Sequence, residues 1–228
     1  PPTDYQVLFF EQYARLDLRN RPRQPRYGAF FALGVHEAIP PGSWSYLRLT
    51  PDARGYIPLP LGMVLAARVA VGVMEIFDTN INTENYPTLA NLGPDTYRLR
   101  GGGPNSVRGF LAGTLGDGLN GGIRRWETSA EVRVPLTTDF ETVVFADMGD
   151  VSQTDFRFNY LQTSLGMGLR YHTVIGPIRL DVGWRVPSWQ VVGEEDKRDP
   201  NRPGKPTDVN LGFIKFPGAV HLTIGEPF

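Results

Sequence analysis

Apolar and polar residues alternate along most of this chain. In the segment 176–187 (GPIRLDVGWRVP), Ile178, Leu180, Val182, Trp184 and Val186 alternate with Arg179, Asp181, Gly183 and Arg185. Because successive side chains of a β-strand point to opposite faces, this pattern predicts a strand over 177–187 with one apolar and one polar face. Similar alternation predicts nine antiparallel strands in all, the others being 5–19, 27–38, 44–57, 63–76, 123–135, 140–150, 162–173 and 219–227.

The predicted connections differ in length. Short turns are expected at 40–43, 59–62, 136–139 and 174–177, whereas about 78–122 and about 188–217 are long and 150–160 is intermediate. Transmembrane barrels have short periplasmic turns on one rim and longer extracellular loops on the other. Aromatic residues also gather near strand ends, as in the girdles of such barrels: Trp44, Tyr46, Tyr56, Trp126, Tyr171, Trp184 and Phe228. The pattern favours an all-β transmembrane barrel, and a soluble β-sandwich or lipocalin-like barrel is the alternative.

Composition narrows the chemistry. The formal net charge is −1, so nothing indicates a nucleic-acid surface. Cysteine is absent, which excludes disulfides, thiol catalysis and thiolate metal sites. The three histidines (His36, His172 and His221) are scattered, so a histidine metal cluster is not expected, and no cofactor is implied. The most apolar run, Val64 to Phe77, is shorter than the roughly 20 residues that a membrane-spanning helix needs.

One long loop contains the stretch GGGPNSVRGF, residues 101–110. Its last four residues, Val107-Arg108-Gly109-Phe110, form a tetrad that is followed along the chain by other short motifs. Those motifs are Glu131 in SAEVRVP, Phe145, Asp147 and Gly149 in VVFADMGDV, the run GMGLRYHTVIGPIRLD, and a terminal strand with Ile-Gly ending in an aromatic residue. A further motif, DLRNRPRQPRYGAF, precedes the loop.

These motifs, in this order, resemble the BamA/TamA-like superfamily of outer-membrane insertases and translocases. The resemblance extends over about residues 17–228. It implies a bacterial outer-membrane location and a transmembrane β-barrel of about nine strands, matching the C-terminal part of a 16-stranded barrel. It assigns residues 1–228 to this barrel portion and no POTRA domain to this chain. The partners that it implies are outer-membrane lipids, unfolded outer-membrane or secreted clients, and accessory assembly subunits.

The resemblance also implies how the loop is placed. The family's loop folds back into the lumen, and its arginine pairs with residues of the barrel wall on the two following strands. In this sequence the expected partners of Arg108 are Glu131 and Asp147, which lie on the polar parity of their strands, with Phe145 and Gly149 beside them. An unpaired buried guanidinium is costly, whereas a carboxylate can bind it with two hydrogen bonds. We expect Gly101, Gly102, Gly103 and Gly109 to give the loop positive φ angles and a close approach to the wall.

The terminal segment 219–228 is the expected lateral gate. Pro227 cannot donate to a ladder and Gly225 weakens the strand, so the last pairing should be the weakest in the sheet. The gate residues are His221, Leu222, Gly225 and Phe228. The function that follows is insertion or translocation of client proteins by lateral gating and strand templating.

Other functions stay open at this point. The same fold serves two-partner-secretion pores and passive outer-membrane channels, and the chain could also be the anchoring barrel of a larger exported protein. An enzyme is not expected. Glu131 and Asp147 are paired carboxylates, but no nucleophile motif or histidine accompanies them.

Overall fold

A computed structural model of the chain describes residues 5–80, 91–117, 120–158, 161–174, 176–186, 209–210 and 215–225. The strands are β1 (Leu8–Asp17), β2 (Gly28–Ile39), β3 (Trp44–Pro58), β4 (Val64–Thr79), β5 (Arg124–Pro135), β6 (Phe140–Ser152), β7 (Gln162–Tyr171), β8 (Ile178–Arg185), β9 (Val209–Asn210), β10 (Lys215–Phe216) and β11 (Gly218–Ile224). Two short 3-10 helices, η1 (Pro60–Gly62) and η2 (Asp95–Tyr97), lie in the connections. Among the described residues, no helix is long and apolar enough to cross a membrane.

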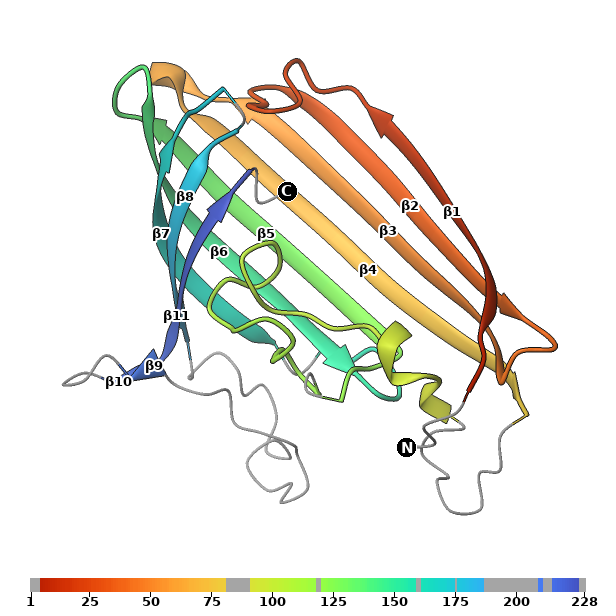
Figure 1. Ribbon diagram of the computed structural model, residues 1–228. Coiled ribbons are helices and arrows are strands. Elements are labelled where there is room, and N and C mark those ends of the chain that lie inside the picture. Colours follow the sequence, from red (N-terminus) through yellow and green to blue (C-terminus); the bar gives the residue numbers. More distant parts are fainter. Residues whose placement is uncertain are drawn as a thin grey trace.

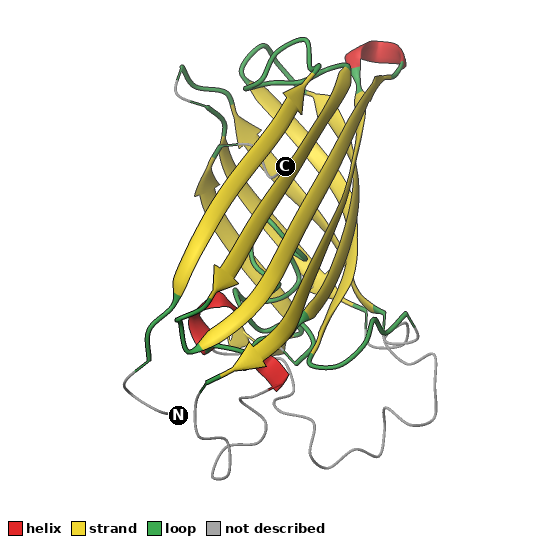
Figure 2. Cartoon of the chain, turned by 90° about the vertical axis from the view of Figure 1, so that its right-hand side faces the viewer, coloured by secondary structure: helices red, strands yellow, loops and turns green. Residues whose placement is uncertain are grey.

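One antiparallel sheet contains nine of these strands, in the order β1-β2-β3-β4-β5-β6-β7-β8-β11. The sheet curves around a hollow, and the connection between β4 and β5 lies on its inner side (Figure 1). Figure 2 shows the strands running steeply along this wall. Within the described residues β1 and β11 are the two edges of the sheet. The wall is therefore part of a barrel, as the strand pattern predicted.

Each of the nine predicted segments matches one strand of this sheet to within three residues at either end, so the strand prediction is confirmed. Two of the predicted connections have features that the hydrophobic pattern did not indicate. The segment 188–217, expected as loop, contains the β9–β10 ladder, whose strands of two residues are too short to show an alternating pattern. The short turn at 40–43 lies on the same rim as the long loops. Consecutive strands of this sheet are antiparallel, so successive connections alternate between the two rims, and the connections after β2, β4, β6 and β8 share one rim.

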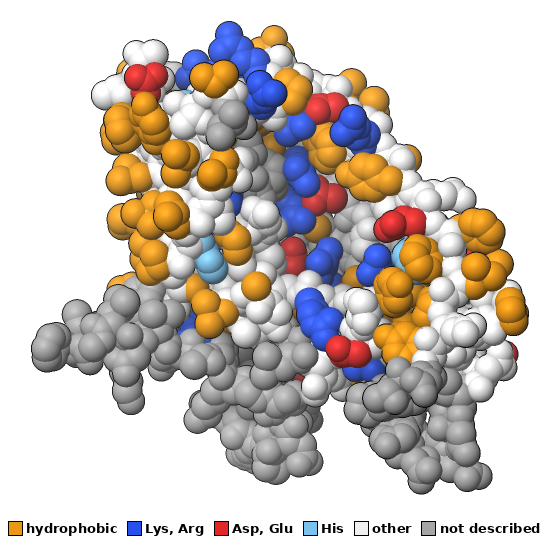
Figure 3. Space-filling view, in the orientation of Figure 1, with side chains coloured by type: hydrophobic (Ala, Val, Ile, Leu, Met, Phe, Trp, Pro, Cys, Tyr) orange, Lys and Arg blue, Asp and Glu red, His pale blue; other side chains and the backbone are white. Residues whose placement is uncertain are grey.

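The sheet is polar inside and apolar outside. Apolar side chains on its outer face are exposed, for example Val69 (53%), Val144 (60%) and Met167 (66%). Charged side chains on its inner face are buried, including Asp147 (0%) and Arg170 (0%). Figure 3 looks into the hollow and shows acidic and basic side chains gathered there. A soluble sandwich buries its apolar face, so this arrangement is that of a membrane barrel rather than a sandwich.

The register of β5 and β6 prepares the inner face for the loop. Glu131 lies opposite Phe145, and Ser129 lies opposite Asp147. All four residues have the inward parity, and each is buried. Because neighbouring residues on one face of an antiparallel pair are in side-chain contact, these four form a single patch on the wall.

Candidate functional site

The loop of residues 101–110 is a compact hairpin. The Gly103 amide donates to the Phe110 carbonyl at 2.9 Å, and the Ser106 amide donates to the Gly103 carbonyl at 3.1 Å. Gly102 (φ 93°) and Gly103 (φ 99°) occupy the left-handed region, which side chains disfavour. These two glycines therefore give the loop its reversal of direction.

Gly101 and Gly109 meet one of the two expectations, the close approach of the loop to its surroundings. Neither has a positive φ angle, so the other part of the prediction was wrong. The close approach is confirmed: a Cβ at Gly109 would lie 2.4 Å from the Ser164 Cβ, and a Cβ at Gly101 would lie 2.8 Å from a Leu115 methyl. Both residues are glycine because the loop approaches its surroundings too closely for a side chain.

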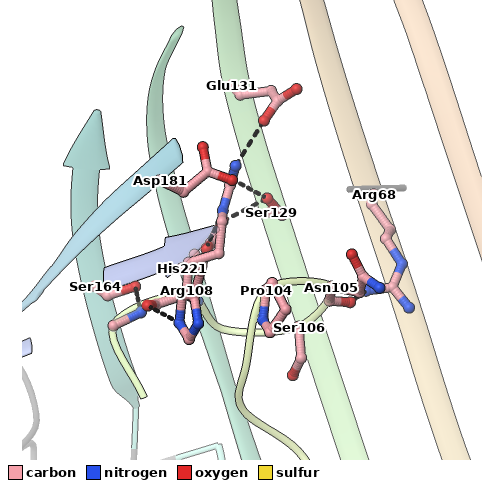
Figure 4. A network of polar contacts seen from close by, with 12 residues as sticks. Arg68, Pro104, Asn105, Ser106, Arg108, Ser129, Glu131, Ser164, Asp181 and His221 are labelled. Carbon is pink, nitrogen blue, oxygen red and sulfur yellow. Dashed lines mark hydrogen bonds and ion pairs between the residues drawn. The ribbon is translucent and has the colours of Figure 1, made fainter. Parts of the chain in front are cut away.

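Arg108 is the buried centre of the site, with 1% of its surface exposed. Its Nε and Nη2 donate to the two carboxylate oxygens of Asp147, each at 2.8 Å, and its Nη1 donates to Glu131 at 2.8 Å. The Nη2 also donates to the Ser129 hydroxyl at 3.2 Å. The guanidinium carbon lies 3.5 Å from the centre of the Phe145 ring. Figure 4 shows Arg108 directed from the loop toward the wall. The predicted contacts of Arg108 with both carboxylates are confirmed.

Glu131 is shared among three cations. Besides Arg108, it accepts hydrogen bonds from Arg133 at 2.8 Å and from Arg170 at 3.0 Å. Asp147 is bound to Arg108 through both oxygens, and the Arg108 backbone amide donates to it as well, at 3.0 Å. Loss of Arg108 would therefore affect Asp147 more than Glu131, which keeps two arginines.

The charge of Arg108 is fixed. Burial alone would lower the pKa of this loop guanidinium, but the charge and hydrogen bonds of Asp147 and the charge of Glu131 outweigh burial and raise the pKa above its ordinary value. The loop thus carries a permanent cation into the wall.

The remaining tetrad residues are apolar anchors. Val107 and Phe110 pack with Leu115 and Val151 in a buried cluster. Gly149, expected beside the loop, makes room instead for β5, because a Cβ there would lie 2.6 Å from the Trp126 carbonyl oxygen and 3.2 Å from the Glu127 side chain. Glu127 in turn accepts a hydrogen bond from the Ser106 hydroxyl.

The expected gate residues divide between the two faces of β11. His221 faces inward, and its Nε2 lies 2.9 Å from the Arg108 carbonyl oxygen. Leu222 faces outward and is 74% exposed. Gly225 follows the strand with φ 104°, and its amide donates to the Pro177 carbonyl at 2.8 Å. Phe228 lies outside the described residues.

Comparison with known proteins identifies the family. A family profile described as the Omp85 superfamily domain matches residues 3–202. This chain belongs to the Omp85 superfamily. Membership places the Omp85 chain in the bacterial outer membrane, in a superfamily that inserts or transports proteins there. A search of curated proteins found no match.

The fold of the Omp85 chain is also found among solved structures. The crystal structure of BamA from Haemophilus ducreyi lacking POTRA domains 1–3 is similar, with a TM-score of 0.65 and 19% sequence identity. The match covers 78% of this chain and 38% of that chain. The Omp85 chain therefore spans well under half the length of that BamA structure.

Several contacts of the Omp85 loop were not predicted from the sequence. The Ser164 hydroxyl accepts a hydrogen bond from the Gly109 amide at 3.1 Å. Arg68, on β4, donates to the Asn105 carbonyl at 2.9 Å, and Arg179, on β8, donates to the Asn105 side chain at 3.1 Å. The signal for these residues was their inward parity, which many other residues share. Within the described part, no three His, Asp or Glu side chains are grouped as a metal ion would require.

Proposed function

We propose that this chain is the gate-bearing wall of an outer-membrane assembly factor, which inserts or translocates β-barrel or secreted proteins. The observation that carries the proposal is the edge position of β11 beside the anchored loop. An edge strand presents unpaired backbone groups, which can template an incoming strand by edge pairing. The proposed partners are outer-membrane lipids, unfolded client proteins and accessory assembly subunits.

In this proposal Arg108 anchors the loop that the assembly function needs. Arg108→Ala should lower the free energy of unfolding by about 3–5 kcal/mol, because it leaves the buried carboxylate of Asp147 without its cation. Client assembly into vesicles should fall to background. Arg21→Ala is the matched control, since Arg21 is exposed in the turn between β1 and β2.

A double variant separates function from stability. Arg108→Ala combined with Asp147→Asn removes the uncompensated charge, so chemical unfolding in vesicles should show part of the stability restored. Client assembly should stay at background, because the loop is still not anchored. If client assembly returns together with stability, Arg108 has only a structural role and the proposed part in assembly is wrong.

A polypeptide-translocating pore or passive channel is the second candidate. The observation that favours it is the charged inner face, which includes charges that do not bind Arg108: Asp52 binds Arg54 at 2.6 Å and Arg68 at 2.7 Å. A charged lumen suits the passage of polar segments and ions. Ion conductance that rises when the loop anchor is removed, without any effect on client insertion, would favour this function.

A further inference from the structure

The terminal strand β11 is attached to more than its neighbouring strand. Its inner face carries two polar side chains, His221 and Thr223, and both are engaged. A carbonyl oxygen can only accept, so the His221 Nε2 donates to the Arg108 carbonyl at 2.9 Å. The Thr223 hydroxyl accepts from Arg179 Nε at 3.0 Å and from Nη2 at 2.7 Å.

Arg179 joins β11 to the tip of the loop. It belongs to β8, where it lies opposite Thr223, and 1% of its surface is exposed. The Nη2 that binds Thr223 also donates to the Asn105 side-chain oxygen at 3.1 Å and to the Pro104 carbonyl at 3.3 Å. The buried guanidinium of Arg179 therefore donates hydrogen bonds both to β11 and to the loop.

The backbone of the loop is seated directly on β8. A Cβ at Gly183 would lie 2.6 Å from the carbonyl carbon and oxygen of Arg108 and 2.7 Å from the Gly109 nitrogen. Because the loop backbone approaches β8 this closely, the Arg108 carbonyl lies within hydrogen-bonding distance of His221 on the next strand. The position of that carbonyl depends in turn on the Arg108 side chain and amide, which Asp147 holds from β6.

We propose that the loop is a latch on the terminal strand: through His221 and the Arg179–Thr223 pair, it fixes the position and order of β11. β11 has a ladder on one side only among the described residues, so hydrogen bonds from its inner face add to the single ladder that holds it. His221, Thr223 and Arg179 are positioning residues in this latch. The consequence for clients rests on the proposed function, but the latch itself can be measured without a client.

Hydrogen exchange on the intact protein in phospholipid vesicles tests the latch. The double variant His221→Leu/Thr223→Val removes the inner-face hydrogen bonds of both side chains and leaves the ladder of β11 with β8. Exchange of the amides that face β8, such as that of Gly225 toward Pro177, should rise by about fivefold to tenfold for each side chain replaced. His221→Gln/Thr223→Ser keeps the donor and the acceptor and should restore most of the protection. Leu222→Val, on the outer face of the same strand, is the control and should change little.

A distant variant tests whether the loop transmits the effect. Asp147 is on β6, separated from β11 by β7 and β8. Asp147→Asn weakens the loop anchor without touching β11, and it should still raise exchange in the peptide 218–225. If Asp147→Asn does not fold, the His221/Thr223 variants alone decide the matter.

The latch is overturned if hydrogen exchange in β11 is unchanged in the His221→Leu/Thr223→Val variant. It is also overturned if Asp147→Asn raises exchange only within the loop. A different result would affect only the proposed function. If β11 exchange rises as expected while client insertion stays at the wild-type rate, the latch stands and lateral gating for client insertion does not.

Discussion

Gly183 shows how a single missing side chain positions the site. A Cβ at Gly183 would lie only 2.6 Å from the Arg108 carbonyl, and this neighbour is backbone, which cannot rotate away. We predict that Gly183→Ala displaces the loop and lowers the free energy of unfolding by about 1–3 kcal/mol, as overpacking does. Chemical unfolding in vesicles measures this decrease.

Gly55→Ala is the matched control for this substitution. Gly55 also lies within a strand, β3, but a Cβ there would meet nothing within 4 Å. Its unfolding free energy should stay within about 0.5 kcal/mol of wild type, as for surface substitutions. Equal decreases in the two variants would mean that glycine is needed for the strand and not for the seat of the loop.

The contacts of single residues differ in how well the sequence predicts them. The contacts of Arg108 with Glu131 and Asp147 were predictable, because the motif resemblance and the inward parity point to the same pair. The contacts of His221 and Arg179 with the loop were not, because they depend on the distance between two backbones. Parity places a side chain on a face but does not say what lies against that face.

At the scale of the strand, the outer face of the sheet carries apolar residues and the inner face carries charged residues. Val69 is an exposed outer residue of β4, paired with Ala53 and Thr128 near the middle of their strands. We predict that Val69→Arg makes folding into vesicles less favourable by about 2–4 kcal/mol, because it places a charge in the apolar part of the bilayer. Reversible folding into vesicles gives this value.

Leu136→Arg provides the comparison for Val69→Arg. Leu136 is also exposed but lies in the turn after β5, where a charge should cost about 0–1 kcal/mol if the turn is at the membrane interface. A similar cost at both positions would show that the outer face is not lipid-facing at Val69, contrary to the membrane-barrel assignment.

The strands themselves were predictable to within a few residues, and the reason is the same two-faced pattern. Each long strand has enough residues to repeat the alternation several times. The β9–β10 ladder has no such repeat. A local turn follows the end of β7, in which the Thr173 carbonyl accepts from the Gly176 amide and the Thr173 hydroxyl donates to the Gly176 carbonyl. Turn contacts of this kind leave no mark in the hydrophobic pattern.

For the molecule as a whole, the decisive feature is that the sheet has two edges within the described part of the chain. A wall of nine strands cannot satisfy the backbone groups of β1 and β11 by itself, and open edges are not tolerated in lipid. In a closed barrel, the free edge of β11 must therefore face another strand. The loop and the terminal strand meet on the inner side of that seam, where the proposed gate would open.

Locking this seam separates the two candidate functions. A cysteine at Leu222 and another on the strand that faces its free edge would form a disulfide only in the closed barrel, and the chain has no cysteine of its own to compete. The control is Leu180→Cys/Leu222→Cys, which locks the permanent pairing of β8 with β11 at two residues that lie opposite each other. We predict that the seam disulfide lowers client insertion to background, that a reductant restores it, and that the control disulfide leaves it unchanged. Insertion at the wild-type rate in the locked barrel would mean that clients do not pass between the strands, and passage through the charged lumen would then be the better explanation.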